Sequence, residues 1–563
     1  MPLSDYLVTD DLTIVLGVIG ISVYLLQNFY KPQPLVHPIL LGRQSDVGRV
    51  RHPGESPVYR NYSTGLMGSF PIRPDKDVNV VNDMVRPQFE ARRTLWSTKI
   101  TNAQLNERVN TFGIGISRIL QEDSNVLLLL NDGIEFLIAD LALAKHSIAS
   151  MTLCSLKLLS RVLEMHPPTA IIVDADFVPL LLELIYDARE YDHKIIVVGK
   201  YERQNLSKAG RQIEVVPWAQ IEADGANTTE PVPAATQRQS IILCPDDPYT
   251  LVFFDTPSGQ MQAVRFTHEN MTSGVAAIRS LFPPSMALSS VDTIVSNHSL
   301  STPYGRAIAH TALYENTSFA TIDSTRMFDI ARVGDNKSPT DDAHLHDLAD
   351  VLSARRHPIP QPTVLFIGPG HLEDLTSSIL KHARESWLYS FAWRHKLAAF
   401  AEGFLSKDSL WDRTVFDSAR ERVLGGMANA LKAVIISGGP ISSEVLTPAR
   451  IALSLPIINV HVSPWVSGPV FATQALDAQV LPPGDEPAHV GGPSVNVEAK
   501  LRGVKDTYLE RENEDPVGEI VVRGPSVGVR VGEEPGNMAW QETGGVGRAM
   551  TNGAFKVIGV CTA

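Results

Sequence analysis

The chain has 563 residues, of which 44% are hydrophobic and 20% are charged, and a chain of this size and composition is long enough for several domains with sizeable cores. Its formal net charge of -13 argues against a nucleic-acid-binding protein, because contacts with phosphates require a basic surface. The three cysteines, Cys154, Cys244 and Cys561, are far apart and follow no metal-binding or disulfide spacing.

The first predicted element is an uncharged run from Leu12 to Tyr30, LTIVLGVIGISVYLLQNFY. Its length is close to the roughly 20 residues that cross the hydrocarbon core of a bilayer. Acidic residues precede the run and basic residues follow it, a distribution that places the rest of the chain in the cytosol. We therefore expect residues 1–30 to be a single-pass membrane anchor, in the endoplasmic reticulum or, alternatively, in the mitochondrial outer membrane or on a lipid droplet. A buried helix is the alternative interpretation.

Three further regions follow the predicted anchor. Residues 31–75 are rich in Pro, Gly and Arg and predict an extended linker. In residues 76–455, amphipathic helical segments such as QLNERVNTFGIGISRIL alternate with short apolar strands such as KIIVVG and YTLVFF. This alternation is typical of a doubly wound α/β architecture. Residues 456–563 carry short strands between Gly/Pro turns and predict a smaller β-rich subdomain.

Several segments carry a resemblance to a known family. In chain order they include ITNAQLNERVNTFGIGI, NVLLLLNDGIEFLIADLALAKHSIAS, DDPYTLVFFDTPSGQMQAVRFTHEN, VIISGGPISSEVL, VGGPSVNVEAKL, GEIVVRGPSV and WQETGGVGR. Together they resemble the long-chain fatty acyl-CoA synthetases of the adenylate-forming, AMP-binding superfamily over roughly residues 75 to 558. The resemblance implies the large domain of these enzymes: two doubly wound α/β subdomains and a small distorted β-barrel subdomain, here preceded by one transmembrane helix. Members of the family bind fatty acid, ATP and CoA, and form an acyl-adenylate and then a thioester.

The resemblance places the phosphate-binding loop of the family within residues 254–270. Family members have a Ser/Thr/Gly-rich turn there that ends in Pro-Lys-Gly, in which backbone N–H groups and the lysine hold the phosphates. This chain keeps Ser258 and Gly259, but Gln262 stands at the lysine position. The cation that the family uses at this point is therefore missing.

Two other residues of the loop also oppose phosphate binding. Pro257 removes a backbone donor from the turn, and Asp255 adds a negative charge that would repel phosphates. We therefore expect residues 254–270 to be a relic of a nucleotide loop, kept as a strand, a turn and the start of a helix. In this interpretation Thr267 and Asn270 form a turn and a helix cap, and Thr267 makes no substrate contact.

After the phosphate loop, a second segment that departs from the family pattern is IINVHVSPWVSGPV. The family has Tyr-Gly-x-Thr-Glu here, with an aromatic ring that stacks on adenine and a glutamate that holds magnesium. Collinear placement puts His461 at the aromatic position and Trp465 at the glutamate position. His461 could still stack on a ring, whereas Trp465 offers no oxygen to a hard cation.

The third departure lies in WQETGGVGR. The family has Thr-Gly-Asp, whose aspartate holds the ribose hydroxyls. Thr543 remains, and Gly545 replaces the acid. Because the sequence ends at FKVIGVCTA, we expect the mobile C-terminal domain of the family to be absent. A metal clip formed by His344 and His346 is a further candidate, but no other ligand accompanies them, and we predict no metal site.

These observations predict a membrane-anchored, long-chain fatty acid–CoA ligase-like pseudoenzyme of lipid metabolism, with no catalytic residues and no cofactor. Its expected partners are the bilayer, a long-chain fatty acid or acyl-CoA, and another lipid-metabolic protein, but no nucleic acid. The alternative is an active ligase with diverged nucleotide contacts. That enzyme would use ATP, Mg and CoA, and a C-terminal domain from another chain or from a missing part of the gene would complete it.

Overall fold

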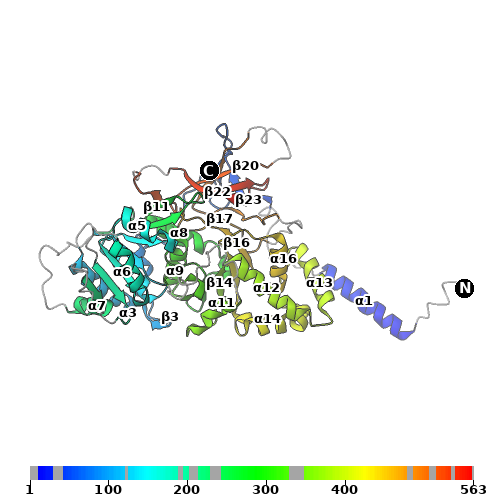
Figure 1. Cartoon of the computed structure of the whole chain (residues 1–563). Coiled ribbons are helices and arrows are strands. Elements are labelled where there is room, and N and C mark those ends of the chain that lie inside the picture. Colours follow the sequence, from blue (N-terminus) through cyan, green and yellow to red (C-terminus); the bar gives the residue numbers. More distant parts are fainter. Residues whose placement is uncertain are drawn as a thin grey trace.

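The described part of the protein contains three β-sheets, two of which are covered by helices (Figure 1). The structure is a computed structural model. It describes residues 10–29, 42–120, 124–187, 194–201, 214–227, 242–328, 348–477, 486–505, 515–533 and 539–560.

An eight-stranded sheet is built mainly from the chain before residue 270, with the strand order β21-β11-β10-β6-β5-β7-β8-β9. Its strands are β5 (Val126–Leu129), β6 (Ser150–Leu153), β7 (Ala170–Asp174), β8 (Lys194–Val198), β9 (Glu214–Pro217), β10 (Pro248–Asp255), β11 (Met261–Thr267) and β21 (Val529–Arg530). The accompanying helices are α3 (Asn102–Ile119), α4 (Ile134–Lys145), α5 (Leu159–Met165), α6 (Val178–Asp187), α7 (Trp218–Ala226) and α8 (His268–Arg279). The strands from β10 to β9 run parallel, and their largely apolar composition reflects helices on both faces.

A nine-stranded sheet has the order β18-β17-β16-β15-β14-β12-β13-β3-β4, and the six strands from β16 to β3 run parallel. Its strands are β3 (Arg93–Leu95), β4 (Thr98–Ile100), β12 (Thr293–Ser296), β13 (Ser318–Thr321), β14 (Val364–Ile367), β15 (Ala433–Ile436), β16 (Ile457–His461), β17 (Phe471–Ala472) and β18 (Gly492–Pro493). The accompanying helices are α9 (Pro303–Glu315), α11 (Leu348–Ser353), α12 (Pro369–Ala383), α13 (Tyr389–Ala401), α14 (Asp417–Leu424), α15 (Met427–Ala430) and α16 (Ser443–Leu453). The predicted α/β architecture is therefore confirmed.

A six-stranded antiparallel sheet lies against the two α/β units, at the top of the view in Figure 1. Its strands, in spatial order, are β1 (Ser45–Val47), β2 (Tyr59–Asn61), β19 (Glu498–Arg502), β20 (Val517–Arg523), β22 (Gln541–Ala549) and β23 (Phe555–Val560). The first two strands come from the predicted extended linker, and β2 pairs with β19. Part of that segment is thus folded into the sheet. Strands of three residues are too short to produce a recognisable alternating pattern.

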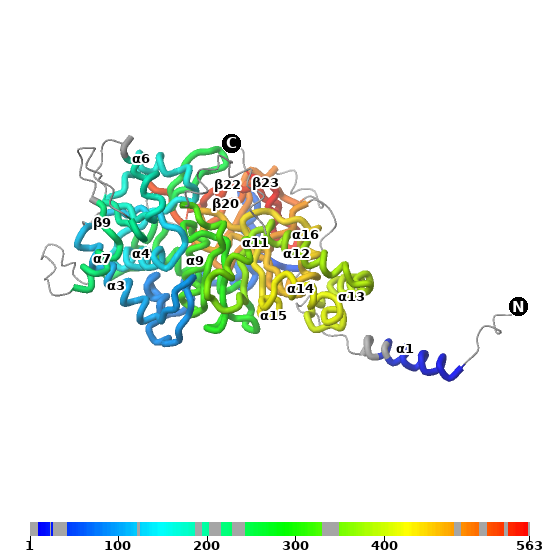
Figure 2. The backbone as a smooth tube through the Cα atoms, turned by 60° about the horizontal axis from the view of Figure 1, so that its bottom comes forward, coloured from blue at the N-terminus to red at the C-terminus, as the bar shows by residue number. Residues whose placement is uncertain are grey.

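Helix α1 (Asp11–Phe29) coincides with the predicted membrane anchor. Within the part of the chain that the structure describes, no helix combines the length and the hydropathy of a membrane span. Figures 1 and 2 show α1 extending away from the rest of the protein.

A buried ion pair joins the two α/β units. Nη1 of Arg306, in α9, lies 3.3 Å from Oδ1 of Asp140, in α4, and both side chains are fully buried. Arg306 also donates to the hydroxyls of Thr250 at 2.8 Å and Thr152 at 2.9 Å. Burial acts to raise the pKa of Asp140, but Arg306 and hydrogen bonds from two neighbouring side chains hold that pKa below its usual value. The pair is therefore charged and connects α9 to α4, β6 and β10.

The Asp140→Ala variant should lower the free energy of unfolding by about 3–5 kcal/mol, because it leaves the Arg306 guanidinium buried without a carboxylate. Urea-induced unfolding measures this loss. Arg356→Ala is the control, since it removes an ion pair with Asp323 in which the arginine is 77% exposed, and it should have a much smaller effect. Similar losses in the two variants would contradict a special role for the buried pair.

Candidate nucleotide site

The predicted site residues come from three segments, and the structure brings these segments close together. A Cβ atom placed on Gly544, in β22, would lie 3.6 Å from Cδ of Pro257, in the turn between β10 and β11. A Cβ atom placed on Gly545 would lie 4.0 Å from Nε2 of His461, at the end of β16. Strand ends from all three sheets therefore meet at one place, as the resemblance implies.

The turn between β10 and β11 is closed by its own hydrogen bonds. The backbone N–H of Thr256 donates to the carbonyl of Gln260, and the N–H of Gly259 donates to the carbonyl of Thr256, both at 2.8 Å. The N–H of Gln260 donates to Oγ1 of Thr256, which also lies 2.9 Å from Oγ of Ser258. Gly259 has a φ of 78°, which favours glycine. Three backbone donors of this turn are thus used internally, and none of the three points outward to wrap a phosphate.

Asp255 forms an ion pair beside this turn. Its Oδ1 lies 2.6 Å from Nη2 of Arg161, next to the turn, and Nη1 of the same arginine donates to the carbonyl of Gly259 at 3.2 Å. A cation therefore lies beside the Asp255 carboxylate, and the repulsion of phosphates by Asp255 stays a prediction. Arg161 lies in α5, far from Asp255 in the sequence, so the loop sequence gave no sign of the pair.

Gln262 and Thr267 are both part of regular structure. Gln262 lies in β11 directly opposite Phe254 of β10, so the two side chains share one face of the sheet. Thr267 is the N-cap of α8: its Oγ1 accepts from the N–H of Asn270, and Oδ1 of Asn270 accepts from the N–H of Thr267. This reciprocal capping box matches the predicted cap.

Trp465 is packed into the protein at the position of the family's glutamate. Only 3% of this residue is exposed, and its ring meets the ring of Phe254 edge to face at 5.5 Å. The guanidinium of Arg530 lies 5.6 Å from the centre of the indole. The position therefore provides aromatic surface and a nearby positive charge, neither of which suits a cation that prefers oxygen ligands.

His461 ends β16 as a half-buried residue, with its ring stacked on Phe471 at a centroid distance of 6.0 Å. Burial lowers the pKa of His461 to about 4. The imidazole is therefore neutral at pH 7. The neutral ring can stack on another ring and can donate or accept a hydrogen bond, but it brings no charge to the site.

Thr543 and Gly545 lie in β22. The hydroxyl of Thr543 donates to the carbonyl of Ile520 at 2.9 Å and accepts from the N–H of Gly545 at 3.3 Å. The nearest atoms to a Cβ at Gly545 would be 3.5 Å away, an ordinary contact distance. A side chain would therefore fit at position 545. The absence of the expected aspartate changes the chemistry of the site and is not required by the packing.

Two polar residues that no sequence motif indicated lie at the carboxyl ends of parallel strands of the nine-stranded sheet. Nε2 of His298, after β12, lies 2.6 Å from Oγ of Ser437, after β15. Burial and the nearby His371 lower the pKa of His298 to about 4, and Ser437 is fully buried. The pair has the spacing of a base and a nucleophile, but a fully buried hydroxyl is not accessible to substrate. In this structure it joins two strand ends. The position of Ser437 directly after the strand in VIISGGP was the only sequence signal.

No group of three or more His, Cys, Asp or Glu side chains suited to a metal occurs within the described residues. His344 and His346, considered above as a metal clip, lie outside that part of the chain. The positions expected to hold ATP and magnesium carry Gln262, Trp465 and Gly545. This set contains no cation and no carboxylate, so it does not fit a metal-bound triphosphate.

Comparison with protein-family models gives a match to "AMP-binding enzyme" over residues 85–529. Long-chain-fatty-acid–CoA ligase 1 of Homo sapiens is 25% identical over 394 residues, which cover 67% of this chain and 50% of the relative. Long-chain-fatty-acid–CoA ligase 5 of Mus musculus is 26% identical over 327 residues, which cover 56% of this chain and 42% of the relative. The chain spans about half the length of the curated relatives it matches.

Solved structures support the same fold. A long-chain-fatty-acid–CoA ligase from Archaeoglobus fulgidus has a TM-score of 0.54 at 13% identity, with 88% of this chain and 85% of that chain covered. A benzoate CoA ligase from Burkholderia xenovorans has a TM-score of 0.55 at 14% identity, with 86% and 80% covered. At this level of identity the likeness shows the fold alone.

The low pKa of His461 predicts acid sensitivity. Between pH 6.5 and about 4 the unfolded chain binds a proton at this histidine and the folded chain does not, so the free energy of unfolding falls by about 1.4 kcal/mol per pH unit as the pH decreases. His461→Phe should remove this contribution and keep the contact with Phe471. Urea unfolding at pH 5 and 6 measures the slope, with the exposed His52→Phe as control. An unchanged slope in His461→Phe would contradict the assignment.

Proposed function

The chain belongs to the AMP-binding enzyme family, and on this premise we propose that it is a long-chain fatty acid–CoA ligase-like pseudoenzyme of lipid metabolism. In this proposal the ligase chemistry is impaired because the site does not hold ATP and magnesium. The function that remains is binding, either of a long-chain acyl group as fatty acid or acyl-CoA, or of another lipid-metabolic protein.

The main support is the environment of Trp465. Its indole is buried against Phe254 at the position where the resemblance expects the glutamate that holds magnesium. A metal-bound triphosphate needs oxygen ligands and compensating charge. One charge interaction at about 4 Å contributes on the order of 4 kcal/mol at an effective dielectric constant near 20. The cation at position 262 and the carboxylates at positions 465 and 545 are therefore absent, and Gln262, Trp465 and Gly545 replace none of their charge interactions.

The acyl part of the proposal is supported by the family and by the preserved scaffold. Several relatives are named as long-chain-fatty-acid–CoA ligases, and the three sheets keep their apolar cores. A scaffold that keeps its apolar cores but lacks the charged groups for ATP and magnesium favours lipid binding as the function that remains. We extend the proposal to association with the cytosolic face of a membrane, and the membrane that we expect is that of the endoplasmic reticulum. In support of this, α1 exposes Leu12, Leu16 and Val18, which gain free energy on leaving water.

Thermal unfolding with single ligands tests the nucleotide part of the proposal. Palmitate should raise the melting temperature, whereas ATP with magnesium at millimolar concentration should leave it unchanged, because only a ligand that binds the folded state stabilises it. AMP-PNP with magnesium serves as a second nucleotide probe. Stabilisation by either nucleotide would contradict the loss of the site, and absence of a palmitate effect would contradict acyl binding.

An activity assay separates the proposal from the alternative of an active ligase. The protein, incubated with ATP, magnesium, palmitate and CoA, should form no palmitoyl-CoA above background, since the triphosphate is not held for acyl-adenylate formation. Ser258→Ala and Gln262→Ala are the matched variants. Product formation that either variant abolishes would establish a working ligase with diverged contacts and would overturn the pseudoenzyme assignment.

A further inference from the structure

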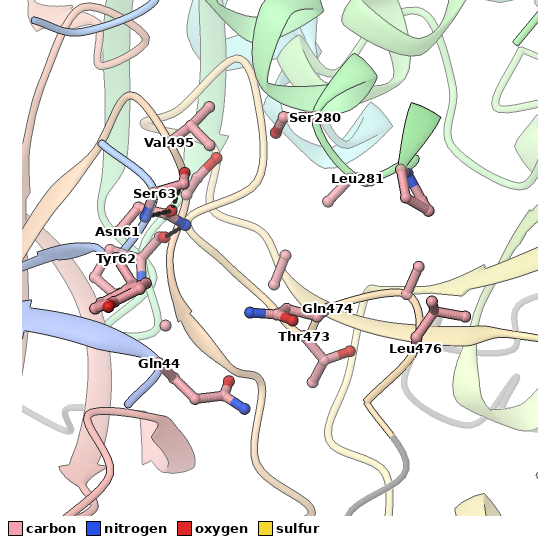
Figure 3. Close-up of a pocket in the computed structure, with 16 residues that line it drawn as sticks. Gln44, Asn61, Tyr62, Ser63, Ser280, Leu281, Thr473, Gln474, Leu476 and Val495 are labelled. Carbon is pink, nitrogen blue, oxygen red and sulfur yellow. Dashed lines mark hydrogen bonds between the residues drawn. The ribbon is translucent and has the colours of Figure 1, made fainter. Parts of the chain in front are cut away.

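A cavity of about 400 Å³ lies apart from the candidate nucleotide site (Figure 3). Four segments and Gln44 line it: residues 61–63 from the end of β2, Ser280, Leu281 and Pro283 after α8, residues 472–476 from the end of β17, and residues 492–495 at β18. Figure 3 shows Ser280 and Leu281 on one side of the open space and Thr473 and Gln474 on the other. The volume falls within the range of about 300–1,000 Å³ that is typical of small-molecule sites.

The walls of the cavity are largely apolar. Leu281, only 7% exposed, and Pro283 contribute from the segment after α8, and Ala475, Leu476 and Val495 contribute from the opposite segments. Apolar walls of this kind favour a ligand with a hydrocarbon body, because burial removes its surface from water.

All described residues that line the cavity are uncharged. Two charged groups lie close to lining residues, and each has a partner. Arg43 stacks on the ring of Tyr62 at 5.3 Å and pairs with Asp46 at 2.9 Å. Asp477 accepts a hydrogen bond from Gln44 at 3.0 Å. An anionic headgroup would therefore enter without a cation to receive it, which is strongly unfavourable in an apolar cavity.

The cavity nevertheless offers neutral hydrogen-bonding groups. Among the described residues, the side chains of Gln474 and Ser494 make no hydrogen bond to protein, whereas Asn61 is occupied by the carbonyl of Pro493 and by Ser63. An amide and a hydroxyl both donate and accept. They match a hydroxyl or ester group and give no preference to a carboxylate.

We propose that this cavity binds a single-chain neutral lipid, of the class of long-chain alcohols and monoacylglycerols. The hydrocarbon chain packs against Leu281, Leu476 and Val495, and the uncharged head bonds to Gln474 and Ser494. This site is separate from the nucleotide site and from the binding of fatty acid proposed above, since it selects against the carboxylate that defines a fatty acid.

Titration of the full chain with dodecan-1-ol and with dodecanoate, which share one chain length, tests the proposal. Calorimetry should detect binding of the alcohol. Leu281→Trp fills the cavity and should lower the affinity for dodecan-1-ol by at least about tenfold. Any binding of dodecanoate at another site should stay unchanged. Leu288→Trp, which alters the neighbouring cavity beside Arg279 and Glu315, is the control and should leave the alcohol affinity unchanged.

A second variant keeps the test independent of folding defects in the cavity-filling variant. Gln474→Lys places a cation at a half-buried position of the wall and should shift the preference of the cavity from dodecan-1-ol towards dodecanoate by about tenfold. Three results would overturn the proposal: no binding of the alcohol to the unmodified protein, alcohol binding that is insensitive to both variants, or an equal loss of alcohol and dodecanoate in Leu281→Trp.

Discussion

A buried arginine connects the two α/β units whose strands meet at the candidate site. Arg306 belongs to α9, between strands of the nine-stranded sheet. Its guanidinium binds Asp140 in α4 and the hydroxyls of Thr152 and Thr250 in strands of the eight-stranded sheet. Because β10 leads directly into the turn at residues 256–260, the same contacts orient that turn towards the carboxyl ends of the other sheet. A buried charge disfavours other arrangements of the two units, because any movement away from its partners leaves the charge unpaired in the interior.

The candidate site combines a preserved scaffold with altered chemistry. Strand ends from three sheets still converge, and α8 still begins at its cap. Aromatic and neutral residues, however, occupy the positions where charged groups are expected. Phe254 and Trp465 contact each other edge to face, and such a contact adds stability to the packing itself. The loss of charged groups therefore need not weaken the fold. Arg161 likewise pairs with Asp255 and donates to the carbonyl of Gly259, so both groups are part of the protein's own hydrogen bonding.

Sequence patterns predicted the fold class because apolar strands and amphipathic helices repeat over long stretches. The same patterns failed where elements were short or their partners distant. Residues 59–61 form a strand by pairing with β19, which lies more than four hundred residues later, and residues 45–47 form a strand by pairing with residues 59–61. Ser437 and His298 were missed because neither residue is unusual until two parallel strands bring them to 2.6 Å.

The sequence by itself determined the local features: the capping box at Thr267, in which donor and acceptor are three residues apart, and the absence of a cation or acid at Gln262, Trp465 and Gly545. These features depend on residue identity and short-range geometry, which the chain carries without folding. Only the tertiary structure decided which groups compensate each other and which spaces stay open. The partner of Asp255 and the walls of the uncharged cavity come from segments far apart in the sequence, and contacts of this kind arise only when long-range packing brings those segments together.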